Sequence, residues 1–232
     1  MQIATSLFCN DALSGLSVYR RSALAQTDAM ANAIKLYRHP LSGHCHRVEV
    51  FLSLLQLPYE LVEVDLRGGE HKQPAFRSKN ALAQIPVIED GDVTLADSNA
   101  ILVYLALRYD AAGRWLPREP LAAAGVQRWL SIAAGELTYG PSALRRNKLL
   151  GAPIDRGLAE QATSNVFTVL EGALAQAPFL CGGQPTIADL ALYAYTARAP
   201  EGGVSLAGRA AISGWLRRIE ALPGFVPMHE AV

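Results

Sequence analysis

Cysteine, net charge and long apolar runs are all scarce in this chain of 232 residues, and each scarcity excludes a class of protein. Its three cysteines, an odd and widely spaced number, argue against a disulfide framework and favour a reducing compartment, so we expect a cytoplasmic protein. A formal net charge of zero gives no electrostatic reason to expect nucleic acid or an anionic membrane as a partner. No apolar run approaches the ~18 residues of a membrane span, so the chain predicts a globular fold.

A proline interrupts an otherwise strand-like run at Ile85-Pro86-Val87-Ile88. Proline cannot donate to a sheet ladder, so we expect it at a strand start, an edge or a bulge. Either the Ile85-Pro86 bond is an ordinary trans bond, or it is cis and Ile85 presents its backbone N–H and C=O to a peptide-like ligand. The Asp-Gly pair that follows predicts a hairpin, so residues 86–95 form two short antiparallel strands.

Two polar residues, Asp97 and Ser98, precede a run with helical apolar spacing. Both are good N-cap residues, so one interpretation is that they only cap the helix. The alternative is that the helix N-terminus binds a carboxylate while Asp97 pairs with an ammonium group. The pair would then hold the amino-acid end of a ligand.

A strand, a helix and a second strand are predicted between residues 34 and 64. Residues 34–37 and 59–64 have the strand pattern, and apolar residues at helical spacing lie between them: Val48, Phe51, Leu52 and Leu55. Such a unit favours a parallel strand pair with a right-handed crossover. Ser42 lies at the junction of the first strand and the helix, where its hydroxyl either caps the helix or faces a ligand.

Five motifs carry a resemblance to a known family: Ser42-Gly-His-Cys-His-Arg-Val48, Gly69-Glu-His-Lys72, Gln84-Ile-Pro-Val87, Asp97-Ser-Asn-Ala-Ile101 and Pro185-Thr-Ile-Ala-Asp-Leu190. In this order and spacing the chain resembles the glutathione transferases, in particular the serine-type branch similar to the theta and zeta classes and their bacterial relatives. The resemblance covers about residues 34–225. It implies an α/β thioredoxin-like N-terminal domain followed by an all-α C-terminal domain.

The resemblance also implies a set of residues that bind glutathione as co-substrate, without a metal: Ser42, His71, Lys72, Gln84, Ile85, Pro86, Asp97 and Ser98. Ser42 matches the position whose hydroxyl stabilises the glutathione thiolate. His71 and Lys72 match positions near the glycine carboxylate, and Ile85, before a cis-proline, pairs with the cysteinyl backbone. Asp97 and Ser98 receive the γ-glutamyl end.

Two features of the N-terminal half need separate interpretation. The loop Asn80-Ala-Leu-Ala83 lacks the proline and glycine that are usual before the cis-proline of this family, so the contacts of Gln84 are expected to differ. Cys45 is either a reactive thiol in the first helical turn or a small buried side chain. Metal binding by His44, Cys45 and His46 is not expected, because consecutive helical residues point about 100° apart.

We predict four segments. Residues 1–33 are an extension outside the resemblance, either disordered or a start-site artefact, and residues 34–112 are the glutathione-binding domain. A turn-rich linker at 113–120 leads to the all-helical domain at 121–232.

Within the helical domain, an Ala-rich helix is expected from Leu121 to Tyr139, ended by Gly140-Pro141. Thr186-Ile-Ala-Asp189 has the spacing of a capping box that starts a buried helix. The outer wall of an electrophile pocket is predicted at Gly135, Thr138 and Tyr139. Arg145 and Arg146 are interpreted as a solvated pair, with selection of an anionic substrate as the alternative.

The sequence thus predicts a homodimeric glutathione S-transferase in which Ser42 activates the thiolate for addition to a small electrophile. One alternative is a glutathione-dependent isomerase, although Gly43 and His44 replace the second serine and the cysteine of the zeta class. Another is dehalogenation or peroxide reduction by the same thiolate. A third is a non-catalytic interaction module with the same fold.

Overall fold

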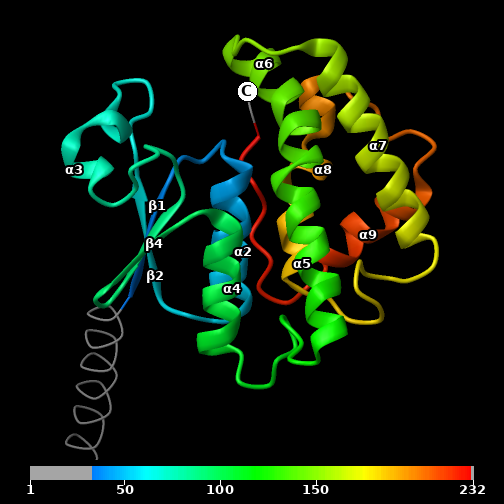
Figure 1. Cartoon of the computed structure of the whole chain (residues 1–232), viewed down its shortest axis with the longest axis horizontal. Helices are drawn as coiled ribbons and strands as arrows, with labels where there is room; N and C mark the ends of the chain where they lie inside the picture. Colours follow the sequence, from blue (N-terminus) through cyan, green and yellow to red (C-terminus); the bar gives the residue numbers. More distant parts are fainter. Residues whose placement is uncertain (1–32, 231–232) are drawn as a thin grey trace, which may run out of the picture.

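A four-stranded sheet and a set of helices lie side by side in the computed structural model, which describes residues 33–230 (Figure 1). The predicted extension at 1–33 therefore lies outside the described residues, except for residue 33. The α/β thioredoxin-like domain followed by a helical domain is confirmed. The predicted linker at 113–120 follows the last helix of the first domain, but its last residue, Pro120, already begins the first helix of the second.

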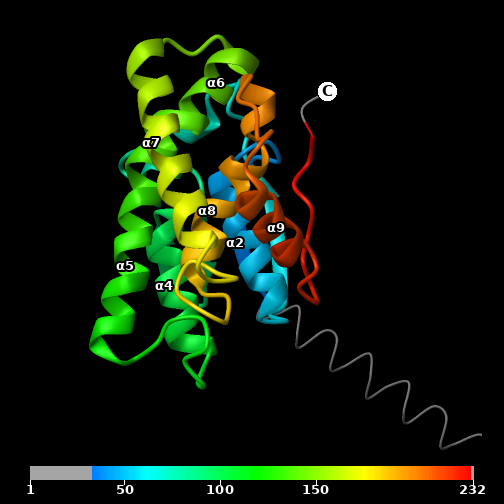
Figure 2. The same cartoon turned by 90° about the vertical axis from the view of Figure 1, so that its right-hand side faces the viewer.

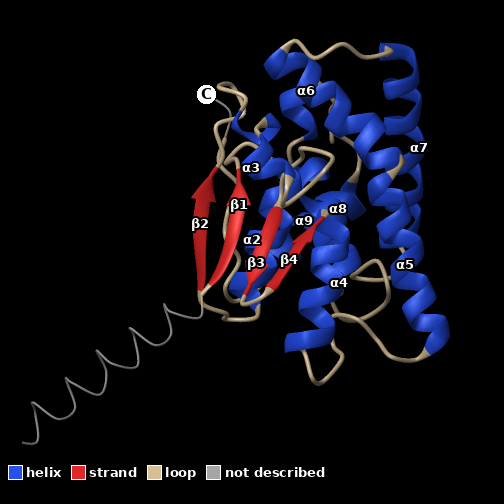
Figure 3. Ribbon diagram, turned by 60° about the vertical axis from the view of Figure 1, so that its left-hand side comes forward, coloured by secondary structure: helices blue, strands red, loops and turns tan. Residues whose placement is uncertain are grey.

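The sheet has the order β2-β1-β3-β4 (Figure 3). β1 (Ile34–Arg38) pairs in parallel with β2 (Tyr59–Glu63), and α2 (Gly43–Leu54) forms the crossover between them. β3 (Val87–Asp90) runs antiparallel to β1 and forms the predicted hairpin with β4 (Val93–Ala96). The predicted strand-helix-strand unit and the hairpin are both confirmed.

Helices cover the sheet unequally. α2 and α4 (Ser98–Tyr109) lie on the face toward the helical domain, while α3 (Pro74–Arg77) lies on the other side, close to η1 (Glu70–Lys72) (Figure 1). The apolar core on the α2 side continues without interruption into the helical domain. For example, the ring of Phe51 packs edge-on against Trp115, with their centroids 5.3 Å apart.

The helical domain consists of α5 (Pro120–Ala134), η2 (Thr138–Ser142), α6 (Ala143–Leu150), α7 (Arg156–Leu174), α8 (Ile187–Ala197), η3 (Ala199–Gly202) and α9 (Ala210–Glu220). α8 lies at its centre, packed against α2 and α5 (Figure 2). The predicted capping box at Thr186 and Asp189 starts α8, and Asp189 also accepts a hydrogen bond from the Trp215 indole at 2.9 Å. No helix in the described part of the chain is long and apolar enough to cross a bilayer.

The predicted helix from Leu121 to Tyr139 is too long, because α5 ends at Ala134, where Gly135 takes a non-helical conformation with φ −91° and ψ −100°. Gly140 is also non-helical, with φ −93° and ψ −106°, so the chain bends again inside η2 before it continues as α6 to Leu150. Gly140 also lies directly against α7, where an added Cβ would come within 2.8 Å of the Thr163 nitrogen. Close packing thus turns a local stop signal into a kink.

The loop before Pro86 compensates for its missing proline and glycine. The Asn80 side-chain amide donates to the Gln84 carbonyl at 2.8 Å, and its oxygen accepts from the Leu82 N–H at 3.0 Å. Ala83 has a φ of 53°, in the left-handed region that favours glycine. The side chain of Asn80 and a strained alanine therefore produce the turn.

Replacing Ala83 with glycine should therefore stabilise the protein. Left-handed backbone costs an L-residue about 1–2 kcal/mol, whereas the added freedom of glycine in the unfolded chain costs about 0.4–1 kcal/mol. We expect Ala83→Gly to raise the free energy of unfolding by roughly 0.5–1 kcal/mol in denaturant titrations. Ala106→Gly, in the regular helix α4, is the matched control and should lower it. A loss of stability in Ala83→Gly would contradict the strained conformation.

Candidate active site

Three segments far apart in sequence meet at one edge of the sheet. The register pairs Tyr37 of β1 with Val87 of β3, and Val87 with Ala96 of β4. The residues just after β1, just before β3 and just after β4 are therefore neighbours. They carry Ser42, Pro86 and Asp97 respectively.

The Ile85-Pro86 bond is cis. Of the two interpretations of this proline, the cis bond is the correct one. Pro86 is buried, whereas Ile85 is half-buried and lies beyond the last residue pair of the β1–β3 ladder.

Ser42 is the N-cap of α2. Its Oγ accepts a hydrogen bond from the Cys45 N–H at 3.3 Å, and the residue is half-buried. Capping uses one acceptor lone pair of the hydroxyl and leaves its O–H available as a donor. The two roles considered for Ser42, capping and facing a ligand, are therefore compatible.

Asp97 and Ser98 begin α4. Asp97 is exposed, has a φ of 72°, and its Oδ1 accepts from the N–H groups of Asn99 and Ala100 at 2.9 Å each. The predicted capping by Asp97 is confirmed. A non-glycine residue held at positive φ is a feature often found at ligand sites. Ser98 is buried, and its hydroxyl is 3.4 Å from Nδ1 of His44.

Arg47 contacts the start of α4, and the sequence assigned it no role of its own. It is almost fully buried, and its Nη1 donates to Asn99 Oδ1 at 2.8 Å and to Ser98 Oγ at 3.3 Å. Its Nε and Nη2 have no hydrogen-bond partner, and no carboxylate of the described residues pairs with it. Burial lowers the pKa of Arg47 to about 10, so it stays protonated at neutral pH.

His44 is a second residue that sequence reasoning left without a role. Its ring packs edge-on against Tyr195 of α8, with the centroids 4.9 Å apart. Burial, together with the charges of Arg47 and Arg146, lowers the pKa of His44 well below its ordinary value. The only signal in the sequence was the position of both residues inside the Ser42 motif.

The segment that carries two of the remaining predicted glutathione residues, His71 and Lys72, leaves the sheet at the end of β2, which adjoins the end of β1. His71 in η1 is half-buried and its Nδ1 is buried without a hydrogen-bond partner. Lys72 and Gln84 are exposed. Their contacts with a ligand stay a prediction.

The predicted electrophile wall lies at the junction of α5 and η2. Thr138 donates its hydroxyl to the Ala133 carbonyl at 2.8 Å, and Tyr139 is 69% exposed. A surface hollow between α5 and α7 includes neither of them, nor Gly135. The wall stays a prediction.

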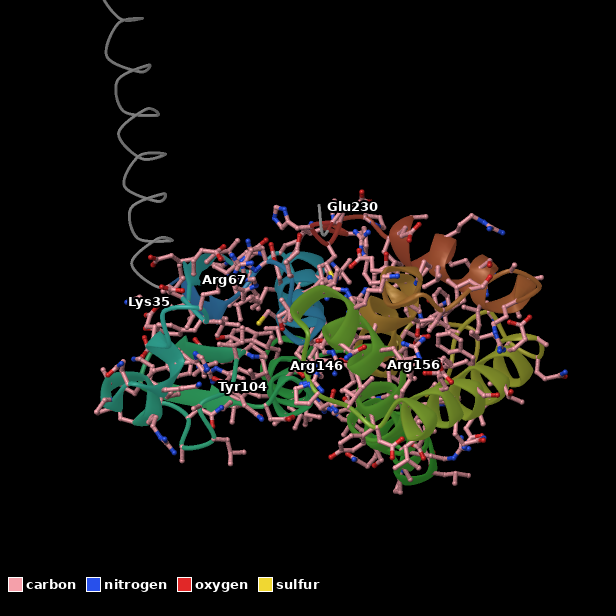
Figure 4. The ribbon with its side chains drawn as sticks, turned by 90° about the horizontal axis from the view of Figure 1, so that it is seen from above. Lys35, Arg67, Tyr104, Arg146, Arg156 and Glu230 are labelled. Atoms are coloured by element: carbon pink, nitrogen blue, oxygen red, sulfur yellow. The ribbon has the colours of Figure 1, made fainter. Side chains whose placement is uncertain are left out.

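Arg145 and Arg146 differ from one another. Arg145 is buried and paired with Glu201, so its interpretation as a solvated residue is wrong. Arg146 is exposed, and its label lies between those of Tyr104 and Arg156 in the view from above (Figure 4). Sequence could not reveal the difference because Glu201 lies far along the chain.

Two family models match the chain: the glutathione S-transferase N-terminal domain over residues 32–107 and the C-terminal domain over residues 143–218. Theta-1 glutathione S-transferase of Bos taurus is 32% identical over 215 residues, covering 85% of this chain and 87% of that protein. The chain belongs to the glutathione S-transferase family. It is a glutathione transferase enzyme with the thioredoxin-like fold.

Two further relatives of this transferase are also glutathione S-transferases. Glutathione S-transferase 3 of Zea mays is 34% identical over 204 residues, covering 83% of this chain and 91% of its own. The crystal structure of a glutathione S-transferase from Pseudomonas fluorescens has a TM-score of 0.79 and 35% identity, covering 85% of this chain and 99% of that one.

Cys45 should be the less reactive of the two cysteines in the described residues. It is 1% exposed, and burial raises its pKa to about 12, so it is protonated at neutral pH. Cys181 is exposed. We expect a thiol reagent to label Cys181 in the native transferase and Cys45 only after unfolding, as measured by peptide mass spectrometry. Rapid native labelling of Cys45 would restore the reactive-thiol interpretation.

Proposed function

We propose that this transferase is of the serine type and binds glutathione at the edge of the sheet where Ser42, Pro86 and Asp97 meet. The observation that carries the proposal is the Ser42 hydroxyl, which caps α2 and keeps its O–H free beside the cis-proline. The Ser42 O–H then donates to the glutathione sulfur and favours its thiolate. A small electrophile is attacked by that thiolate.

The Ser42 hydroxyl and the N-terminus of α2 can supply the free energy needed to lower the pKa of the glutathione thiol. A free thiol has a pKa of about 8.5, and lowering it by about two units needs ~2.7 kcal/mol. A hydrogen bond to a charged group contributes about 1.5–3 kcal/mol, and a helix N-terminus adds about 0.3–1 kcal/mol for an anion. Ser42 at the start of α2 supplies both.

Binding is assigned to the groups around Ser42. Asp97 pairs with the γ-glutamyl ammonium, while the N-terminus of α4 and the buried charge of Arg47 favour its carboxylate. Ile85 pairs its backbone with the cysteinyl residue. His71 and Lys72 lie toward the glycine carboxylate.

The transferase reaction is preferred over the other reactions of the same thiolate. An isomerase of the zeta type would have a serine and a cysteine where this chain has Gly43 and His44. Family membership as an enzyme disfavours a non-catalytic module. The homodimer remains part of the proposal because the family is typically dimeric.

Removing the Ser42 hydroxyl should return the pKa of the bound glutathione thiol to its ordinary value. We expect Ser42→Ala to raise the pKa of bound glutathione by about two units and to lower kcat at pH 7 roughly 25-fold through the loss of thiolate, with binding retained. Ultraviolet difference absorbance of the bound thiolate across pH, with turnover of an aryl halide, measures both.

The matched control for Ser42→Ala is Asp155→Ala. Asp155 caps α7 through the Leu158 N–H at 3.0 Å, so its removal costs a helix cap elsewhere. This control should leave the thiol pKa unchanged, and Ser42→Thr should keep most of the thiolate. A bound thiolate that survives in Ser42→Ala would refute the serine mechanism.

Replacing Asp97 with asparagine separates binding from activation. Asparagine is an equally good N-cap, so α4 should persist, but the pairing with the ligand ammonium is lost. We expect the Kd of glutathione to rise roughly tenfold to a hundredfold with little change in the bound thiol pKa. Isothermal calorimetry and the absorbance titration test this, and unchanged affinity would remove Asp97 from the site.

A further inference from the structure

Arg145 connects the helical domain to the turn that carries Ser42. Its Nη1 donates to the carbonyl oxygen of Leu41 at 2.7 Å, and Leu41 immediately precedes Ser42. Its Nε donates to Glu201 Oε2 at 2.6 Å. Within residues 33–230, no other hydrogen bond joins the helical domain to residues 39–42.

The peptide unit between Leu41 and Ser42 is held at both of its polar ends. Its N–H donates to the His39 carbonyl at 2.9 Å, and its C=O accepts from Arg145. Because a peptide unit is planar, fixing both ends fixes the orientation of the whole plane. Ser42 leaves that plane with φ −87° and ψ 113°, the extended conformation of an N-cap.

Arg145 is itself held firmly. Its side chain is 4% exposed, and its partner Glu201 also pairs with Arg198, with the Nη1–Oε1 distance at 3.4 Å. Gly202, next to Glu201, packs closely against α6, and an added Cβ there would be 2.8 Å from the backbone nitrogen of Arg145. The donor that reaches Leu41 therefore has little freedom to move.

We propose that Arg145 is a positioning residue for thiol activation. Through the Leu41 carbonyl it fixes the Ser42 hydroxyl where the glutathione sulfur binds, and Glu201 keeps Arg145 in place. Because Glu201 offsets the charge of Arg145, we expect Arg145 to act by holding the Leu41 carbonyl in place, and not through the electrostatic effect of its charge on the thiolate. The inference rests on the proposed function of Ser42.

The test compares Arg145→Gln and Arg145→Lys with the wild type. We expect Arg145→Gln to raise the pKa of bound glutathione by about one unit and to lower kcat at pH 7 about threefold, while KM for glutathione changes less than about twofold. Lysine keeps a charged donor but not the planar fork, so Arg145→Lys should recover part of the loss. An unchanged thiol pKa in Arg145→Gln would overturn the proposal.

Glu171→Gln is the matched control in the same domain. The Glu171 carboxylate accepts from the N–H groups of Ala211 and Ile212 at 2.9 and 3.0 Å, so its loss weakens the start of α9 without touching the turn. It should lower thermal stability and leave the thiol pKa unchanged. An equal pKa rise in this control would mean that Arg145 acts only through general stability.

Glu201→Gln distinguishes geometry from charge. If Arg145 acted through its field, removing the opposing carboxylate would lower the thiol pKa. Positioning predicts that the pKa rises, because Arg145 loses its anchor. A lowered pKa overturns the proposal.

Hydrogen–deuterium exchange tests the positioning without relying on catalysis. We expect the Ser42 amide to exchange faster in Arg145→Gln than in the wild type, since the peptide unit is then held at one end only. If the wild type shows no bound thiolate, the proposed function fails and this exchange measurement alone decides on Arg145. Equal exchange rates in the two proteins would refute its positioning role.

Discussion

Burial of α2 on every side is the constraint on which the rest of this structure depends. The helix lies between the sheet and α8, and all its residues from Cys45 to Leu52 are buried (Figure 1). A buried polar group must find its partner inside the protein. Each polar side chain of this stretch consequently ties α2 to a different element. Arg47 reaches α4, and Glu49 pairs with Arg38 of β1.

The C-terminal segment follows from the same constraint. His46 Nε2 lies 2.8 Å from the Val226 carbonyl oxygen, and Ser53 donates to the Gly224 carbonyl at 2.7 Å. The chain after α9 therefore returns across the helical domain to α2 (Figure 2). The helix that carries Ser42 at its start is thus fixed by the sheet, by α4 and by the end of the chain. Preorganisation of this kind is what the proposed role of Ser42 in thiol activation requires.

Sequence predicted the elements whose signals are local. Apolar spacing located α2, the Asp-Gly pair located the β3–β4 hairpin, and the capping box located α8, because each depends on a few neighbouring residues. It failed at the end of α5, which breaks at Gly135 instead of Gly140, and at Arg145, whose partner Glu201 is 56 residues away. The motif brought Ser42 and Asp97 to one site, but the buried position of Arg47 required the three-dimensional structure.

Arg47 and Arg145 bury a guanidinium in two different ways. Arg145 has a carboxylate and a carbonyl as acceptors and leaves only its Nη2 unpaired, so its charge is compensated within the folded chain. Arg47 has only two neutral acceptors, Ser98 and Asn99, and two of its nitrogens stay unpaired. An uncompensated buried cation disfavours the ligand-free fold, and an anion bound nearby removes part of that cost. Because Arg47 lies directly beneath the start of α4, its charge adds to the helix dipole, and both favour a carboxylate at Ser98.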